Sequence, residues 1–292
     1  MDKTATKQKM TCSRISLRIT LFVIGLLLLN QLVYAIIVPL IFFNASYSED
    51  DYRSLLAQSD PRELVIDTEN GSLYGWELGN NSDAVLLYFG GDNVDSNAWL
   101  RSVLDTAGSK PFGNVTLLTV DYPTFGRSSG TVSEQYFYET AQKLHDYARQ
   151  HYPHASLYVM GYSMGTAAAL SLADEDDVAG LLLIAPMYDG TSLYLPRQSF
   201  LHTVFEPTAT VQMQNDEFAP VCAAPTLIVA GYDDTMTKAE DVFALAALFP
   251  QMPKVQMLED CAHGAYWQRA ETYSAITSFL YDIEKQINET GD

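Results

Sequence analysis

The stretch Gly161-Tyr162-Ser163-Met164-Gly165 constrains the fold of this chain most, because it separates two segments of different character. Before it lies the apolar run 157–160, which favours a buried strand, and after it comes the small, helix-favouring run 166–170. A G-x-S-x-G sequence between a strand and a helix predicts a sharp turn that exposes the serine hydroxyl. Both glycines are expected because such a turn brings the backbone too close for a Cβ atom. Ser163 is therefore predicted to be the nucleophile of a hydrolase or an acyl transferase.

Short apolar runs alternate with helical or loop segments through the rest of the body. The runs lie at 84–89, 115–120, 157–160, 178–185, 226–230 and 255–258. Continuous apolarity of this kind suits strands that are buried on both faces of a parallel sheet. Helices are expected at 97–104, 133–151, 163–172, 239–248 and 266–285, and a hairpin is expected around the Asn-Gly pair at 70–71. An opening hairpin followed by strand–helix units predicts a doubly wound, mostly parallel α/β fold.

The N-terminal part of the chain differs from this body. Residues 1–18 are basic, and residues 19–43 are almost wholly apolar, with Asn30 and Gln31 as the strongly polar interruptions. Such a run is long enough to span a bilayer as one helix. Five positive charges precede it, so the positive-inside rule predicts a single-pass anchor with a cytoplasmic N-terminus and an extracytoplasmic body, periplasmic in a bacterium. A signal peptide cleaved after Ala35 and a buried core helix are the alternatives.

The body is strongly acidic. The chain has 292 residues and a formal net charge of −19, and five of its 17 basic residues but only one of its 36 acidic residues lie before residue 19, so the remainder carries −23. Such a surface excludes binding of DNA or RNA through phosphates and is repelled by anionic lipid headgroups. The cysteines Cys12, Cys222 and Cys261 form no disulfide framework. Cys222 precedes one expected strand and Cys261 follows the next parallel one, so a bridge between these opposite ends is not expected.

A serine nucleophile needs a base and an acid that orients the base, and in a doubly wound sheet such groups gather at the carboxyl ends of strands. Of the five histidines, His263 directly follows the last strand and is the expected base. The preferred acid is Asp234, with Asp233 second and Asp189 third, because all three follow strands. The resulting chain order of serine, aspartate and histidine is that of the α/β-hydrolase type.

An oxyanion hole is expected from the N–H of Met164 and one N–H in the loop 89–93, given by Gly91 or Asp92. Two adjacent glycines in that loop let the backbone turn its amides toward a ligand. The interval 189–220 breaks the strand–helix rhythm and is interpreted as a short cap, whose aromatic residues favour an apolar acyl group. Substrate contacts are predicted for Tyr162, Tyr194, Phe200 and His202.

One further segment resembles a motif of a known family. The segment 121–130, Asp-Tyr-Pro-Thr-Phe-Gly-Arg-Ser-Ser-Gly, is similar to the D-Y-R-G-Y-G-x-S-x-G loop of the membrane-anchored BEM46-like, ABHD12/ABHD13-like group of α/β-hydrolases. The resemblance covers about residues 60–285 and maps Ser163, Asp234 and His263 onto the family's catalytic triad. Where that group often has His-Gly-Asn, this chain has Gly-Gly-Asp at 90–92. An Asp92 amide in the hole would require its carboxylate to point away, because a nearby anion opposes oxyanion stabilisation.

The resulting hypothesis divides the chain into a basic tail (1–18), an anchor (19–43), a linker (44–62) and an α/β-hydrolase domain (63–288) with the cap inserted. The expected reaction is ester hydrolysis through an acyl-enzyme, with no metal or other cofactor. Placement at a membrane favours neutral lipid or lysolipid esters, while thioesters and peptides stay open as substrates. A catalytically silent hydrolase-fold protein that binds a partner is the alternative of a different class.

Overall fold

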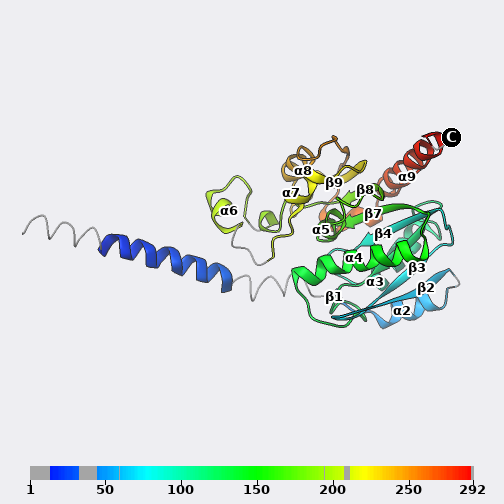
Figure 1. Ribbon diagram of the computed structural model, residues 1–292, viewed down its shortest axis with the longest axis horizontal. Coiled ribbons are helices and arrows are strands. Elements are labelled where there is room, and N and C mark those ends of the chain that lie inside the picture. Colours follow the sequence, from blue (N-terminus) through cyan, green and yellow to red (C-terminus); the bar gives the residue numbers. More distant parts are fainter. Residues whose placement is uncertain (1–13, 33–44, 59, 194, 207–210, 291–292) are drawn as a thin grey trace, which may run out of the picture.

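In the computed structural model, the described residues are 14–32, 45–58, 60–193, 195–206 and 211–290. They form an N-terminal helix and a body in which helices cover both faces of one sheet (Figure 1). Most of the basic tail, the second part of the predicted anchor and Tyr194 lie outside the described residues. The predicted doubly wound α/β architecture is confirmed, and the elements below show how it positions the site.

The sheet has eight strands in the order β10-β9-β8-β7-β4-β6-β3-β2. Six neighbouring strands are parallel: β10 (Lys254–Leu258), β9 (Thr226–Gly231), β8 (Val178–Ile184), β7 (Ser156–Tyr162), β4 (Ala84–Phe89) and β6 (Thr116–Val120). β2 (Pro61–Thr68) and β3 (Gly71–Leu78) form the expected antiparallel hairpin at one side. Every residue of β4, β6 and β9 is buried, as their continuous apolar runs predict. The carboxyl ends of the six parallel strands meet at one edge of the sheet, called here the carboxyl edge.

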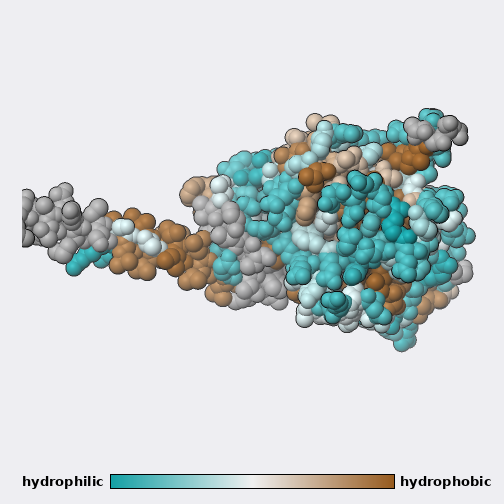
Figure 2. All heavy atoms as spheres, viewed as in Figure 1, coloured by the Kyte–Doolittle hydropathy of each residue, from teal (hydrophilic) through white to brown (hydrophobic). Residues whose placement is uncertain are grey.

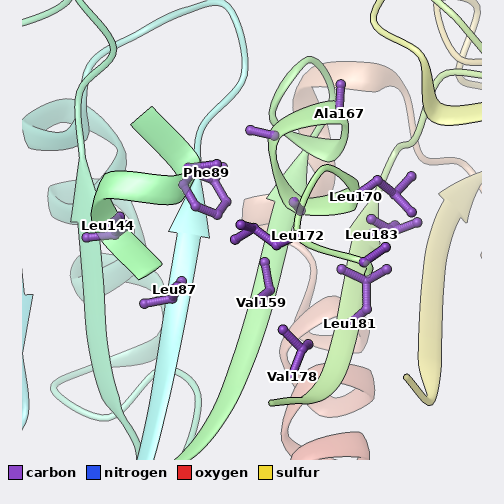
Figure 3. Close-up of a cluster of buried hydrophobic side chains, with 14 of the residues drawn as sticks. Leu87, Phe89, Leu144, Val159, Ala167, Leu170, Leu172, Val178, Leu181 and Leu183 are labelled. Carbon is purple, nitrogen blue, oxygen red and sulfur yellow. The ribbon is translucent and has the colours of Figure 1, made fainter. Parts of the chain in front are cut away.

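Two apolar cores cover the two faces of the sheet because successive residues of a strand point to opposite sides. In β4, Leu87 and Phe89 belong to the core under α4 (Glu134–His151), α5 (Gly165–Leu170) and α8 (Ala239–Ala246). Leu86 and Tyr88 belong to the opposite core, under α3 (Ser96–Ala107) and α9 (Ala270–Thr290). Figure 3 shows the first core, with side chains from β4, β7 and β8 directed toward α4 and α5. This rigid support fixes the turns at the carboxyl edge.

The described residues of the segment 44–62, which was expected to be a linker, instead belong to the body. The helix α2 (Glu49–Leu56) begins at Ser48, whose side chain accepts the Asp51 N–H (3.2 Å), and its acidic first turn suits a helix N-terminus. Leu55 of α2 is fully buried, and α2 packs on α3. Just before it, β1 (Ala45–Ser46) pairs in parallel with β5 (Asn93–Val94). A short helix with one buried leucine gives too weak a periodicity to be recognised from sequence.

The predicted cap follows β8 and contains the 3₁₀ turn η1 (Thr191–Leu193), α6 (Phe200–Phe205), α7 (Asn215–Phe218) and the 3₁₀ turn η3 (Ala219–Val221). Its last part is held against α5, because the buried Asn215 side chain donates to Thr166 Oγ1 (3.0 Å) and to the Met187 carbonyl (2.8 Å). The cap is therefore attached to the helix that follows Ser163.

The N-terminal helix Arg14–Leu32 is long and apolar enough to cross a membrane, and its residues are almost all exposed. Its surface is largely hydrophobic, whereas the visible face of the body is mostly hydrophilic (Figure 2). A membrane anchor and a signal sequence both fit these properties.

Candidate active site

Ser163 lies in the turn between β7 and α5, at the carboxyl edge. Its backbone φ of +51° is a left-handed conformation, uncommon for a residue other than glycine. A Cβ atom on Gly161 would lie 2.3 Å from the Gly165 carbonyl oxygen, and one on Gly165 would lie 2.1 Å from the Phe89 carbonyl oxygen. Both glycines are thus sterically required, for the reason that the sequence pattern gave. The turn brings Ser163 close to the loop that follows β4.

His263 and Asp234 extend a chain of hydrogen bonds from this serine. The Ser163 Oγ lies 2.8 Å from His263 Nε2, and His263 Nδ1 lies 2.8 Å from Asp234 Oδ2. Because an ionised carboxylate only accepts hydrogen bonds, Nδ1 carries the proton and Nε2 is left to accept from the serine hydroxyl. This is the arrangement in which an imidazole removes a proton from a nucleophile while a carboxylate fixes its tautomer.

Asp234 is buried and held by an unusually full set of donors. Its Oδ1 accepts the N–H groups of Met236 and Thr237, each at 2.9 Å. Its Oδ2 accepts not only from His263 but also from the Thr237 hydroxyl (2.8 Å) and the Tyr266 hydroxyl (2.9 Å). Burial alone acts to raise the pKa of Asp234, but His263 and Thr237 outweigh it and hold that pKa below its ordinary value. The carboxylate therefore stays ionised and oriented beside the imidazole.

The geometry shows which of the three aspartates considered as the orienting acid contacts His263. Asp233 is exposed, whereas its neighbour Asp234 contacts His263. Asp189 is buried in the cap, where its carboxylate lies 2.9 Å from Nε2 of His202, so it serves a different histidine. Burial raises the pKa of Asp189 despite this partner.

The loop after β4 lies directly against the serine. A Cβ atom on Gly91 would lie 3.3 Å from the Ser163 Cβ and 3.0 Å from the Tyr162 ring, so the absent side chain lets this backbone approach the nucleophile. In the described part of the chain the Met164 N–H donates to no backbone carbonyl, which leaves it available to a ligand. Burial raises the pKa of Asp92, and the charge of His263 acts against that rise. The direction expected for the Asp92 carboxylate, away from the hole, stays a prediction.

A second buried carboxylate fixes the far end of this loop. Asp121 follows β6, and its side chain accepts the N–H (2.6 Å) and the hydroxyl (2.9 Å) of Ser96, the first residue of α3. Burial, together with the nearby Asp95, raises the pKa of Asp121 to about 7. The room for this carboxylate depends on Gly126, because a Cβ there would lie 2.1 Å from Asp121 Oδ2.

A family model described as alpha/beta hydrolase family matches residues 89–280, which include the serine, the aspartate and the histidine. The chain belongs to the alpha/beta hydrolase family. Among curated proteins, the alpha/beta hydrolase domain-containing protein aho-3 of Caenorhabditis elegans is 27% identical to this α/β-hydrolase over 160 residues, which are 53% of this chain and 44% of that protein. The match thus spans less than half of the relative's length.

Solved structures resemble this α/β-hydrolase over most of its length. An esterase of Pyrococcus furiosus is 19% identical with a TM-score of 0.63, and the match covers 82% of this chain and 96% of the esterase. A bacterial membrane phospholipase A is 17% identical with a TM-score of 0.60, covering 94% and 99%. Est1E of Butyrivibrio proteoclasticus, solved with ferulic acid, is 17% identical with a TM-score of 0.62, covering 76% and 99%. At these identities the likeness shows the fold.

The residues predicted to contact substrate have different surroundings. Tyr162 is half-buried, its ring stacks 5.6 Å from the His263 ring between centroids, and its hydroxyl donates to the His263 carbonyl (2.5 Å). His202 is buried against Asp189. Phe200 is 80% exposed on α6 and has no contact with Ser163, His263 or Asp234 among the described interactions. The structure thus brings Tyr162 to the site and leaves Phe200 at the surface.

Two side chains that support the acid, Thr237 and Tyr266, were missed by the sequence analysis. Tyr266 lies three residues after His263 in the 3₁₀ turn η4 (His263–Gln268), and its hydroxyl bridges the Gly231 N–H (2.8 Å) and Asp234. Burial and the adjacent Asp234 carboxylate raise the pKa of Tyr266 far above its ordinary value, so it stays a donor. The spacing of three residues was the one available signal, since it places both side chains in a single helical turn.

One cluster outside the site has ligand atoms spaced closely enough for a metal ion. Atoms of His145, Glu175 and Asp177 all lie within 4.8 Å of one another. Arg149 forms an ion pair with Asp177 and also donates to its carbonyl (2.8 Å), so a guanidinium already neutralises this carboxylate. The cluster joins α4 to the loop before β8, at the edge of the sheet away from Ser163, and it fits an ion-pair network better than a metal centre.

Proposed function

We propose that this α/β-hydrolase is a membrane-anchored serine esterase that cleaves carboxylic esters through an acyl-enzyme. The observation that carries the proposal is the unbroken set of hydrogen bonds from Ser163 through His263 to Asp234. A lone serine in a sharp turn would have a structural explanation, but a serine joined to a histidine and a buried carboxylate at these distances is the arrangement that activates a nucleophile.

In the proposed reaction, His263 accepts the Ser163 proton while Oγ attacks the ester carbonyl. The N–H groups of Met164 and of Gly91 or Asp92 stabilise the tetrahedral oxyanion, and the protonated His263 returns its proton to the leaving alcohol. Water, activated by the same histidine, then releases the acid. Asp234 stabilises the imidazolium throughout and is not itself protonated.

The substrate class follows from the anchor and the charge. The N-terminal helix would hold the body at a membrane surface with its N-terminus in the cytoplasm, as the positive charges before it favour. A body of charge −23 disfavours anionic substrates, so neutral lipid or lysolipid esters fit best. The loop at 121–130 further supports membership of the BEM46-like, ABHD12/ABHD13-like group, and the similarity to a membrane phospholipase A agrees with lipid esters as substrates.

The test is covalent labelling of the full chain, purified in detergent, by a fluorophosphonate probe. Labelling should disappear in Ser163→Ala and persist in Ser171→Ala, a matched change in the same α5 region that leaves the hydrogen bonds of Ser163 intact. Turnover of short esters should fall by about 10⁶ in Ser163→Ala, the order found when a triad serine is removed. A folded wild type that the probe does not label would contradict the proposal and favour a catalytically silent binding protein.

A further inference from the structure

The chain passes from the apolar N-terminal segment directly to the loop beside the nucleophile. Ala45–Ser46, the first described residues after that segment, pair in parallel with Asn93–Val94. The Ser48 N–H then donates to Asp95 Oδ2 (3.4 Å), which extends the contact along the same loop. Asn93 follows Gly91 by two residues, and the Gly91 backbone lies against Ser163. The body therefore begins, after the apolar N-terminal segment, at the loop that borders the candidate active site.

The connection between the two parts is short. The described part of the N-terminal helix runs to Leu32, and Ala45 follows 13 residues later, so the chain between them can reach at most about 45 Å. The sequence of residues 33–43, Val-Tyr-Ala-Ile-Ile-Val-Pro-Leu-Ile-Phe-Phe, contains no charged residue. Transfer of such a segment from water into the bilayer or its interface is favourable, so it does not act as a long aqueous tether. The edge of the body nearest the bilayer is then the one that carries β1 and β5.

Exposed apolar side chains gather in loops at the same edge. Phe200 and Leu201 are 80% and 49% exposed at the start of α6 in the cap that follows β8. Val94 of β5 is exposed in the loop after β4, and Tyr232 and Met236 are exposed in the loop after β9. All three loops follow the carboxyl ends of parallel strands. Figure 1 shows α6 and β1 on the side of the body away from the C-terminal end of α9.

We infer that the carboxyl edge of this protein docks on the surface of an uncharged or zwitterionic lipid bilayer, and that α6 of the cap inserts into the interfacial region of that bilayer. The docking must be apolar, because a body of charge −23 gains nothing from anionic headgroups. In that orientation Ser163 faces the membrane, and an ester reaches it from the lipid phase without crossing water. The inference deepens the proposed function, on which its choice of lipid esters as substrates rests.

The docking itself can be measured without any catalysis. The full chain, with Cys12→Ser, would carry one engineered cysteine labelled with an environment-sensitive fluorophore; Cys222 and Cys261 are free but buried. The test site is Leu201→Cys and the matched control is Met252→Cys, which is 77% exposed in the loop before β10, at the opposite edge of the sheet. Both proteins are reconstituted into phosphatidylcholine vesicles, with and without spin-labelled phosphatidylcholine that quenches the fluorophore at shallow depth.

Spin-labelled lipid should quench the probe at position 201 at least threefold more than the probe at position 252. Equal quenching at the two positions would overturn the inference, and a blue-shifted but unquenched probe at 201 would overturn it in favour of a protein occupant. Neither result depends on Ser163, so the docking can fail while fluorophosphonate labelling succeeds, and the reverse.

A second variant connects docking to substrate access. Leu201→Asp should lower hydrolysis of a vesicle-embedded lipid ester about tenfold, because a charge replaces a membrane-buried leucine. Hydrolysis of a water-soluble 4-nitrophenyl ester should change less than twofold. An equal loss on both esters would contradict docking and indicate instead that Leu201 acts on the site itself, while Met252→Asp should leave both rates unchanged.

Discussion

Replacing Tyr266 with phenylalanine removes one hydroxyl that serves two buried groups. That hydroxyl donates to Asp234 Oδ2 (2.9 Å) and accepts the Gly231 N–H (2.8 Å). A hydrogen bond to a charged acceptor contributes about 1.5–3 kcal/mol, and a buried N–H left without a partner costs about 1–3 kcal/mol. The two losses share one atom and are not additive, so we expect the free energy of unfolding to fall by about 3 kcal/mol.

The effect on reactivity follows from the other donors to the carboxylate. Asp234 keeps the Thr237 hydroxyl and two backbone amides, so it stays beside His263 in the variant. Without the tyrosine hydroxyl, however, Oδ2 loses one of the donors that fix its position beside the His263 Nδ1–H. Looser positioning of the carboxylate and the imidazole should lower the maximal rate by about 10-fold.

The assay is the second-order rate of fluorophosphonate labelling, beside urea unfolding followed by tryptophan fluorescence. Tyr273→Phe is the matched control: its hydroxyl is also buried and donates to the Trp267 carbonyl (2.8 Å), but it does not contact the acid. That variant should lose stability without a change in the labelling rate. If Tyr266→Phe keeps the labelling rate of the wild type, Tyr266 does not position the acid and the reasoning fails.

Two further changes test the turn and the buried carboxylate. Gly161→Ala should lower the free energy of unfolding by at least about 3 kcal/mol and abolish probe labelling, because its Cβ would lie 2.3 Å from the Gly165 carbonyl oxygen. The control is Gly264→Ala, whose Cβ would have no atom within 4 Å, and it should leave both stability and labelling intact. In Asp121→Asn, the free energy of unfolding relative to wild type should improve between pH 5 and pH 8, by at most about 3 kcal/mol. The sign follows because burial and Asp95 raise the folded-state pKa of Asp121 to about 7, so the folded wild type holds a proton that the unfolded chain has released and loses stability as pH rises from about 4 to 7. A relative stability that is the same at both pH values in urea titrations would contradict this.

Much of the sheet follows from local sequence because its strands are buried on both faces. The run Ala84–Phe89 was predicted with the bounds of β4, since every one of its residues is buried and apolar. The same property predicts that residues after the strands converge at one edge, which is why Ser163, Asp234 and His263 could be named from their positions alone. Their catalytic roles remain a prediction, although the distances between them fit it.

The parts that the sequence left undetermined depend on contacts between segments far apart in the chain. Asp234 and Asp233 both follow β9, and the contacts of Asp234 with Thr237 and His263 distinguish them. The pairing of Ala45–Ser46 with the loop after β4 leaves no pattern in either segment.

The loop after β4 contacts three other parts of the chain: the turn that carries Ser163, the carboxylate that follows β6, and the strand β1. Phe89 is pressed against the turn of the nucleophile, since its carbonyl would meet a Cβ on Gly165. Ser96, at the far end of the loop, is tied to Asp121. Between them, β5 pairs with the strand that leads in from the apolar segment. A proposed oxyanion hole held in this way is coupled to the nucleophile, to a carboxylate whose pKa burial raises to about 7, and to the strand that follows the apolar N-terminal segment. Attachment of the body to a bilayer would thus act on the same few backbone amides that the proposed chemistry requires.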